Sequence, residues 1–176
     1  LAEALRTRSP RLLDAAGRLL GNPYHYRDRR SEGMPALVDA SVSADQLYAT
    51  TGIQRMQINT LYHLVGMRQG GDPLLDVADS MLLIPDLLHY WLTGRKVAEY
   101  TNATTTQFFD ARERRWATEL LEALGLPTRM LPEVVQPGTP LGELLPEVRQ
   151  ARGLRGPAPV FASATHDTAS AVAGVP

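Results

Sequence analysis

The stretch FASATHDTASAVAGVP, residues 161–176, runs from an apolar segment into adjacent His and Asp side chains and then into small residues. Residues 159–163 have the apolar pattern of a buried strand, and residues 167–173 have the composition of a helix. Residues 166–168 therefore lie where a strand ends and a helix begins. In open α/β sheets ligands bind beyond the carboxyl ends of the strands, so this junction is a candidate functional site.

Asp167 has the chemistry of a general base. The start of a helix favours a negative charge, and a carboxylate there suits a base that accepts a proton from a hydroxyl group. The alternative is structural, because Asp and Thr are common at helix starts, and Asp167 or Thr165 would then only cap the helix. A Ser-His-Asp triad with Ser163 or Ser170 is a poor interpretation, because neighbouring side chains on one turn diverge.

Length and composition limit the possible classes of protein. The chain has 176 residues, enough for one domain with a buried core, and it is 44% hydrophobic and 21% charged, which is typical of a globular fold. Its net charge of −1 points to neither nucleic acid nor an anionic membrane as a partner. It has no Cys, and its four His residues show no metal-binding spacing, so we predict no metal site in this chain. Neither a membrane span nor a signal peptide is visible, and we expect a cytoplasmic protein.

Turn residues, caps and apolar runs divide the rest of the chain into short elements, whose mixture indicates an α/β or α+β fold. The expected elements are a β-hairpin around residues 14–17, a helix over 44–50 between Ser43 and Gly52, a helix over 60–68 capped by Asn59, a strand over 80–84, a helix from Pro85 to Gly94, and a helix over 116–124. Residues 126–142 are Pro-rich and without periodicity, so we expect a long surface connection there. We place Leu87, Tyr90 and Trp91 in the core rather than at a ligand.

Five segments together resemble one protein family. They are LLDAAGRLLGNPYHYRDRR (12–30), GIQRMQINTLYHLV (52–65), LLIPDLLHYWLTGRKVAEYTNATTTQFFD (82–110), GLPTRMLPEVVQPGTPLGEL (125–144) and VFASATHDTASAVAGVP (160–176). Their order and spacing are similar to the amino-terminal domain of the FGGY carbohydrate kinases, within which they most resemble the group that phosphorylates L-rhamnulose. TNATTTQ followed at a distance by HDTASA is the specific part of this resemblance, which covers residues 12–176.

The resemblance implies a fold and a reaction. The fold would be the ribonuclease H-like, actin-like α/β domain of sugar kinases, in an incomplete form. Asp167 would be the catalytic base that takes the proton from the primary hydroxyl of the sugar as this hydroxyl attacks the γ-phosphoryl group of ATP. The product would be L-rhamnulose 1-phosphate. His166 and Thr168 would line the sugar site beside Asp167.

Further sugar contacts follow from the family's aromatic-x-Asp-x-Arg motif, onto which Tyr26, Asp28 and Arg30 fall. The residues alone are also compatible with a local ion pair between Asp28 and Arg30. Asn59 is a predicted sugar contact as well, with capping or loop bridging as the open alternative. The segment TNATTTQ, residues 101–107, is expected to have a structural role near the cleft.

The complete enzyme would need ATP and Mg²⁺, whose donors are not expected in this chain. The family's Asp-x-Gly-x-x-Ser/Thr phosphate-binding hairpin has no match here, and the carboxy-terminal domain, which supplies most of the nucleotide site, would begin after Pro176. The chain is therefore divided into an atypical segment, residues 1–11, in which no strand is expected, and a partial amino-terminal kinase domain, residues 12–176. The isolated chain is expected to lack kinase activity.

Two other functions remain open. The chain could be a non-catalytic remnant or sugar-binding module, which sugar binding that ignores Asp167→Ala would favour. It could also belong to a kinase of another ketose, aldose or polyol, because specificity depends on a few contacts. In each case the expected partner is a small-molecule sugar, and the oligomeric state is not predicted.

Overall fold

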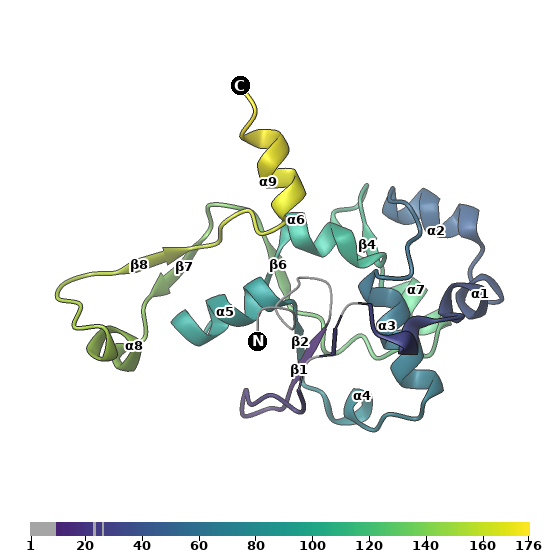
Figure 1. The fold of residues 1–176 in the computed structure, drawn as a ribbon, viewed down its shortest axis with the longest axis horizontal. Helices are drawn as coiled ribbons and strands as arrows, with labels where there is room; N and C mark the ends of the chain where they lie inside the picture. Colours follow the sequence, from purple (N-terminus) through teal and green to yellow (C-terminus); the bar gives the residue numbers. More distant parts are fainter. Residues whose placement is uncertain (1–9, 23, 26) are drawn as a thin grey trace.

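The computed structural model describes residues 10–22, 24–25 and 27–176. The predicted sugar contact Tyr26 and most of the segment 1–11 lie outside the described residues. The helices are α1 (Met34–Asp39), α2 (Ala44–Thr51), α3 (Thr60–Gln69), α4 (Leu74–Val77), α5 (Ile84–Thr93), α6 (Tyr100–Ala103), α7 (Thr118–Ala123), α8 (Pro146–Ala151) and α9 (Asp167–Ala173), with 3-10 helices η2 (Arg29–Ser31) and η3 (Thr104–Thr106). The strands are β1 (Arg11–Leu13), β2 (Ser80–Leu82), β3 (Val97–Glu99), β4 (Phe109–Asp110), β5 (Arg115–Trp116), β6 (Glu133–Val135), β7 (Pro140–Glu143) and β8 (Pro159–Phe161) (Figure 1).

Local sequence signals explain where helices α2 and α5 begin and end. The Ser43 side chain caps α2 by accepting a hydrogen bond from the backbone N–H of Gln46, and Gly52 ends the helix with a φ of 69°. Pro85 lies in the first turn of α5, where its missing N–H costs nothing, and Gly94 ends that helix with a φ of 76°. Both predicted helices are confirmed.

The described strands pair two by two. Three pairs are antiparallel, β1–β2, β4–β5 and β7–β8, while β3 and β6 are parallel, with Glu99 opposite Val135. The predicted turn around residues 14–17 is confirmed, because the N–H of Asp14 donates to the carbonyl of Arg18 at 2.9 Å. Helices between the strands carry the chain from one pair to the next, as expected for a mixed α/β fold.

The main hydrophobic core joins α1, α2, α3, α4 and α7 to the β1–β2 pair. Leu61 and Leu64 of α3 and Leu121 of α7 are fully buried at its centre. Burial of one such side chain contributes about 1.5–3 kcal/mol, so this region supplies much of the stability of the chain. None of the helices in the described ranges has the length and apolar character needed to cross a bilayer.

Residues 126–142 are not the surface connection that the sequence predicts. They contain β6 and the start of β7, and Leu126, Met130, Val135 and Leu141 are buried. The prediction was wrong because these strands are short and are held by partners distant in sequence, β3 and β8. Local periodicity has no access to such pairings.

Three smaller predictions also change. Trp91 is 49% exposed rather than part of the core, because α5 buries the face that carries Leu87 and leaves Trp91 on the other. Helix α7 begins at Thr118 rather than residue 116, because Arg115–Trp116 form β5. Arg11 belongs to β1, so a strand begins within the segment 1–11.

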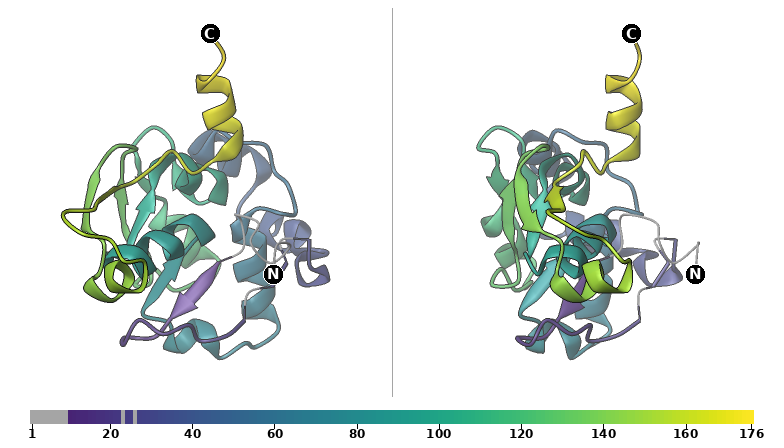
Figure 2. Two further views of the ribbon diagram at one scale, coloured as in Figure 1. Left: turned by 60° about the vertical axis from the view of Figure 1, so that its left-hand side comes forward. Right: turned by 90° about the vertical axis from the view of Figure 1, so that its left-hand side faces the viewer.

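Residues 140–176 form what we call the C-terminal arm: β7, α8, β8 and α9. Figures 1 and 2 show α9 projecting from the body of the molecule beyond α6. All residues of the arm are described, and neither α8 nor α9 contains a buried residue. After Ala162, which is 1% exposed, none of the described residues through 176 is buried. The arm thus ends in a helix without a core of its own.

Candidate functional site

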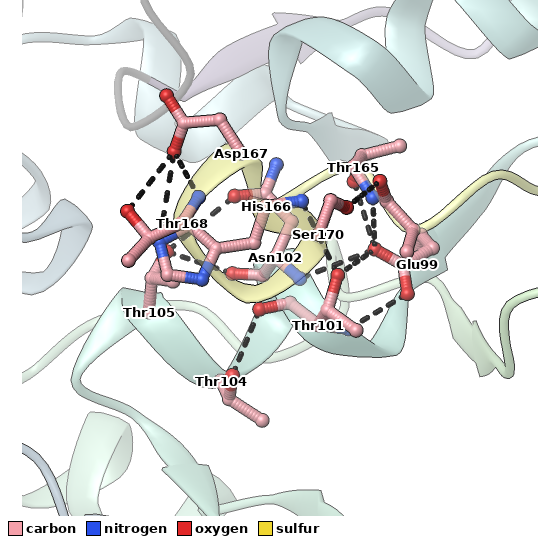
Figure 3. A network of polar contacts seen from close by, with 11 residues as sticks. Glu99, Thr101, Asn102, Thr104, Thr105, Thr165, His166, Asp167, Thr168 and Ser170 are labelled. Carbon is pink, nitrogen blue, oxygen red and sulfur yellow. Dashed lines mark hydrogen bonds and ion pairs between the residues drawn. The ribbon is translucent and has the colours of Figure 1, made fainter. Parts of the chain in front are cut away.

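Asp167 is the first residue of α9, at the end of the connection from β8. Its side chain is 87% exposed. Oδ1 accepts hydrogen bonds from the backbone N–H of Thr168 at 2.7 Å and from the Thr168 hydroxyl at 3.3 Å, and His166 Nε2 lies 3.9 Å from the same oxygen. Oδ2 has no hydrogen bond to any described residue and points away from these groups (Figure 3). One oxygen therefore fixes the carboxylate, and the other is open to a ligand.

The two residues before Asp167 are tied to the turn between β3 and α6. The carboxylate of Glu99 accepts hydrogen bonds from the Thr165 N–H at 3.0 Å and from its hydroxyl at 2.8 Å. The backbone N–H of His166 donates to the hydroxyl of Thr101 at 3.2 Å, and that hydroxyl donates to Glu99 at 2.6 Å. Figure 3 shows these contacts converging on Glu99 from segments far apart in sequence.

The contacts of Thr165 and Asp167 bear differently on the capping alternative. The residue in the N-cap position is His166, whose side chain makes no capping hydrogen bond to any described residue. The Thr165 hydroxyl is bonded to Glu99, and Asp167 bonds only to the residue that follows it. Thr165 therefore does not cap α9, whereas Asp167 accepts the N–H of Thr168, the second residue of the helix, so its contacts are compatible with the capping role as well as with a catalytic one.

A second buried carboxyl, that of Asp86 in α5, lies behind Glu99. Its Oδ1 accepts the backbone N–H of Glu99 at 2.9 Å, and both side chains are fully buried. Burial raises the pKa of Asp86 to about 7, with the nearby charge of Glu99 as a smaller contribution. On the next turn of α5, burial lowers the pKa of His89. Asp86, His89 and Glu99 are thus buried polar side chains, and Glu99 contacts the segment that carries Asp167.

The segment TNATTTQ forms α6, η3 and the turn that follows them. Three of its hydroxyls bond back to its own carbonyls: Thr104 to Thr101 at 2.9 Å, Thr105 to Asn102 at 2.8 Å and Thr106 to Ala103 at 2.7 Å. Gln107 is 1% exposed and has a φ of 70°, a left-handed conformation that is uncommon for a residue other than Gly. This compact turn carries Thr101, one of the groups that hold the Asp167 segment, which is a structural role.

Asn59 precedes α3 and is fully buried. Its side-chain amide donates to the carbonyl of Gln54 at 3.3 Å and to the side chain of Gln107. Gln107 in turn donates to the Thr51 hydroxyl and to the Ile53 carbonyl. Asn59 thus bridges two loops, which was the alternative to a sugar contact. Its contact with the sugar stays a prediction.

Asp28 and Arg30 form a local ion pair, which was the alternative to a sugar contact. Arg30 Nε lies 3.0 Å from Asp28 Oδ1. The backbone N–H of Arg30, followed by its side chain, holds the pKa of Asp28 below its usual range. The Arg30 guanidinium also stacks on the Tyr24 ring, 3.1 Å from its centroid, a cation–π arrangement. The pair opens η2, and η2 packs on α3 at Gly66, where a Cβ would lie 2.4 Å from the Arg30 carbonyl oxygen.

The predicted site residues thus form two groups in the structure. Residues 166–168 lie together at the start of α9, and Asp28 lies with Arg30 on η2. Among the described residues, no hydrogen bond or ion pair joins one group to the other. Sequence reasoning missed Glu99, although its position directly before the TNATTTQ helix, where it accepts the N–H groups of Thr101 and Asn102, is a recognisable capping signal.

A metal ion has no obvious place among the residues that the structure describes. Nowhere in the described ranges do three or more His, Cys, Asp or Glu side chains gather closely enough to hold one. The residues present therefore do not by themselves fit a Mg²⁺ site.

The fold is shared with solved structures of sugar kinases. A xylulose kinase from Rhodospirillum rubrum matches 94% of this chain and 34% of its own with a TM-score of 0.83 and 23% identity. A gluconate kinase from Lactobacillus acidophilus matches 89% of this chain and 32% of its own with a TM-score of 0.79 and 22% identity. The architecture is thus the actin-like ATPase fold of the sugar kinases, as the resemblance predicted.

The sequence places the chain more narrowly. The FGGY family of carbohydrate kinases, N-terminal domain, matches residues 7–174, and the chain belongs to this family. It is 46% identical over 166 residues to a rhamnulokinase from Pectobacterium atrosepticum and 44% identical over 165 residues to one from Bacteroides thetaiotaomicron. The match covers 94% of this chain in both cases, but 32% and 34% of those proteins. The chain thus spans about a third of the length of these relatives.

Proposed function

We propose that this chain is the sugar-binding part of an ATP-dependent carbohydrate kinase that converts L-rhamnulose to L-rhamnulose 1-phosphate. The observation that carries the proposal is the exposed carboxylate of Asp167, held at the start of α9 in a member of the FGGY family. The relatives named rhamnulokinase, at 40–46% identity, support L-rhamnulose as the sugar.

In the proposed reaction Asp167 is the general base. It accepts the proton of the primary hydroxyl as the sugar oxygen forms a bond to the γ-phosphorus of ATP and the bond to the bridging oxygen breaks, releasing ADP. Phosphoryl transfer passes through a loose transition state, so positioning of the hydroxyl matters more than covalent chemistry. The geometry suits this role, because Oδ1 is fixed by Thr168 and Oδ2 is open.

The neighbours of Asp167 are proposed sugar contacts. The Thr168 hydroxyl and the His166 ring both lie at Oδ1 of the carboxylate, next to the place proposed for the hydroxyl that loses its proton. Asp28 and Arg30, with Tyr26 and Asn59, are proposed to contact the sugar away from the reacting oxygen. ATP and Mg²⁺ are proposed for the complete enzyme, and none of the steps assigned to this chain passes through the metal ion.

Replacing Asp167 in the full-length gene product tests the proposal. The wild-type protein is assayed for ADP release with L-rhamnulose and MgATP, and Asp167→Asn is expected to lower kcat about 10²–10⁴-fold, the usual contribution of a general base. The matched control is Asp45→Asn, an exposed Asp in the first turn of α2, which should keep full activity. Activity above half of wild type in Asp167→Asn would show that another group takes the proton.

The substrate is tested in the same assay. L-rhamnulose is compared with other ketoses, aldoses and polyols at equal concentration, and it is expected to give the highest kcat/KM. A higher value for another sugar would keep the kinase and change its substrate. Sugar binding without ADP release from any sugar, unaffected by Asp167→Ala, would indicate a binding module instead.

A further inference from the structure

One buried carboxylate connects the body of the molecule to the segment that carries Asp167. Glu99 is fully buried at the end of β3, and it accepts hydrogen bonds from a residue 66 positions later in the chain. It plays no part in the proton transfer proposed above. Its contacts nevertheless reach the two residues directly before Asp167.

The α9 helix has little else to hold it. None of its residues is buried, and every one of them is described. The Ser170 hydroxyl donates to the carbonyl of Ala164 at 2.8 Å, but this bond lies within the segment itself. Side-chain packing, which places most helices, is therefore slight within α9, although the His166 side chain directly before it is only 20% exposed.

Hydrogen bonds to Glu99, direct or through Thr101, restrain the backbone just before Asp167. Oε2 accepts the Thr165 N–H and hydroxyl, and Thr101, itself bonded to Glu99, accepts the N–H of His166. Two successive backbone amides directly before Asp167 are thereby fixed to one point. Oε1 accepts the N–H of Thr101 at 2.8 Å, and Oε2 also accepts the N–H of Asn102 at 3.3 Å, so the carboxylate is itself held from below.

From these contacts we infer that Glu99 is the positioning residue of the Asp167 segment: its buried carboxylate anchors Thr165 and His166 and so sets the place of the proposed base. The inference rests on the proposed function for its kinetic consequence. Its structural consequence, the anchoring itself, does not depend on which reaction the protein catalyses.

A carboxylate suits this task better than any neutral side chain of similar size. Glu99 meets only donors, namely the N–H groups of Thr101, Asn102 and Thr165 and the hydroxyls of Thr101 and Thr165. A carboxylate only accepts hydrogen bonds, whereas the NH₂ group of Gln would face N–H groups that it cannot bond. Glu99→Gln therefore keeps the volume of the side chain and removes part of the anchor.

The kinetic test compares three variants of the full-length gene product. Glu99→Gln and Thr165→Val are each expected to lower kcat about 10- to 100-fold, since a misplacement of about 1 Å costs up to about 10²-fold, while KM for the sugar changes less than about threefold. Thr165→Ser, which keeps the hydroxyl, should retain most of the activity. The control is Glu133→Gln on the adjacent strand β6, an exposed carboxylate paired with Arg95, which should leave kcat unchanged.

A double variant separates positioning from a general effect on the fold. If Glu99 acts through Asp167, then adding Glu99→Gln to Asp167→Asn lowers kcat little further, because the base that it positions is already gone. Independent, multiplicative losses in the double variant would contradict the inference. Thr165→Val covers the case in which Glu99→Gln does not fold, because Thr165 is only partly buried.

Amide hydrogen exchange tests the anchoring without any reference to activity. In the wild type the N–H groups of Thr165 and His166 are bonded, and Glu99→Gln is expected to speed their exchange at least tenfold, while Glu133→Gln has no effect. Unchanged exchange in Glu99→Gln would overturn the inference. If instead the wild type phosphorylates no sugar, or Asp167→Asn stays active, the proposed function fails, and the exchange rates still decide whether Glu99 anchors this segment.

Discussion

The core around α3 and the start of α9, in the C-terminal arm, are held in place by different physical means. In the core, helices bury apolar faces on one another, and Leu61, Leu64 and Leu121 have no exposed surface. In the arm, every residue of α8 and α9 is described and none of them is buried. The segment leading into α9 makes directed hydrogen bonds to Glu99 instead. Apolar burial is strong but non-directional, whereas hydrogen bonds contribute less and fix direction. Stability and the placement of Asp167 should therefore respond to different substitutions.

Asp86 bonds to the backbone of Glu99, the residue that holds the start of α9, and its titration has the largest expected effect. Burial raises its pKa in the folded chain from 3.8 to about 7. Between these values the folded state keeps a proton that the unfolded state has lost, so the free energy of unfolding falls as pH rises from about 4 to 7 and stays low above that. The shift corresponds to a cost of up to about 4 kcal/mol at pH 8, at about 1.4 kcal/mol for each pH unit. Asp86→Asn should flatten this part of the pH profile in urea unfolding.

Asp79 provides a control of opposite sign for the Asp86 experiment. Hydrogen bonds from Ser80 and Lys96 lower the pKa of Asp79, so its stabilising contribution is present above about pH 4 and is lost as pH falls further. Asp79→Asn should therefore change the acid end of the profile and leave the region between pH 5 and 8 parallel to wild type. If Asp86→Asn and wild type have the same slope between pH 4 and 7, Asp86 does not carry the predicted cost.

A large-to-small substitution in each region separates the core from the arm directly. Leu64→Ala removes a fully buried side chain and should lower the free energy of unfolding by about 3 kcal/mol, within the usual range for buried Leu. The matched substitution in the arm, Leu154→Ala, removes a side chain that is 48% exposed and should cost less than about 1 kcal/mol. Urea unfolding followed by circular dichroism measures both. Equal losses would mean that the arm is part of the same cooperative core.

Replacing one glycine in each region compares how closely the backbone is packed in the core and in the arm. A Cβ at Gly66 would lie 2.4 Å from the carbonyl oxygen of Arg30, so Gly66→Ala must separate η2 from α3 and should cost about 2 kcal/mol, as overpacking usually does. In the arm, a Cβ at Gly174 would meet its nearest described atom, the carbonyl oxygen of Ser170, at 3.4 Å, and Gly174→Ala should be nearly neutral. Because Asp28 and Arg30, two of the proposed sugar contacts, lie at the start of η2, a rise in KM for the sugar should accompany the loss of stability in Gly66→Ala alone.

The sequence predicts well those features that depend on neighbouring residues. Ser43 with Gly52 bounds α2, Pro85 with Gly94 bounds α5, and the apolar-to-small transition places α9 at Asp167. Each signal lies within one helical turn of the feature that it predicts. The same locality explains why the sequence alone puts Asp167 at the junction of a strand and a helix.

Features that depend on distant partners could not be predicted. Strands β6 and β7 fall in a Pro-rich stretch, and only their partners β3 and β8 make them strands. Glu99 looks like an ordinary strand or cap residue in the sequence, because 66 residues separate it from its partner Thr165. Likewise, nothing in the sequence around Asn59 indicates that its amide reaches Gln107. The placement of the site thus depends on non-local contacts, which no local pattern of residues encodes.

The smallest expected effect is at the outer surface of α9. Val172 is 71% exposed, and Val172→Ser should change the free energy of unfolding of the 176-residue chain by less than about 0.5 kcal/mol, as most surface substitutions do. Val38→Ser in α1, where the side chain is fully buried, is the contrasting variant and should lose several times as much. If Val172→Ser lowers the free energy of unfolding by more than about 1 kcal/mol, the outer face of α9 packs against the rest of the chain. Glu99 would then share the placement of Asp167 with apolar contacts, and amide exchange at Thr165 and His166 would respond to both substitutions.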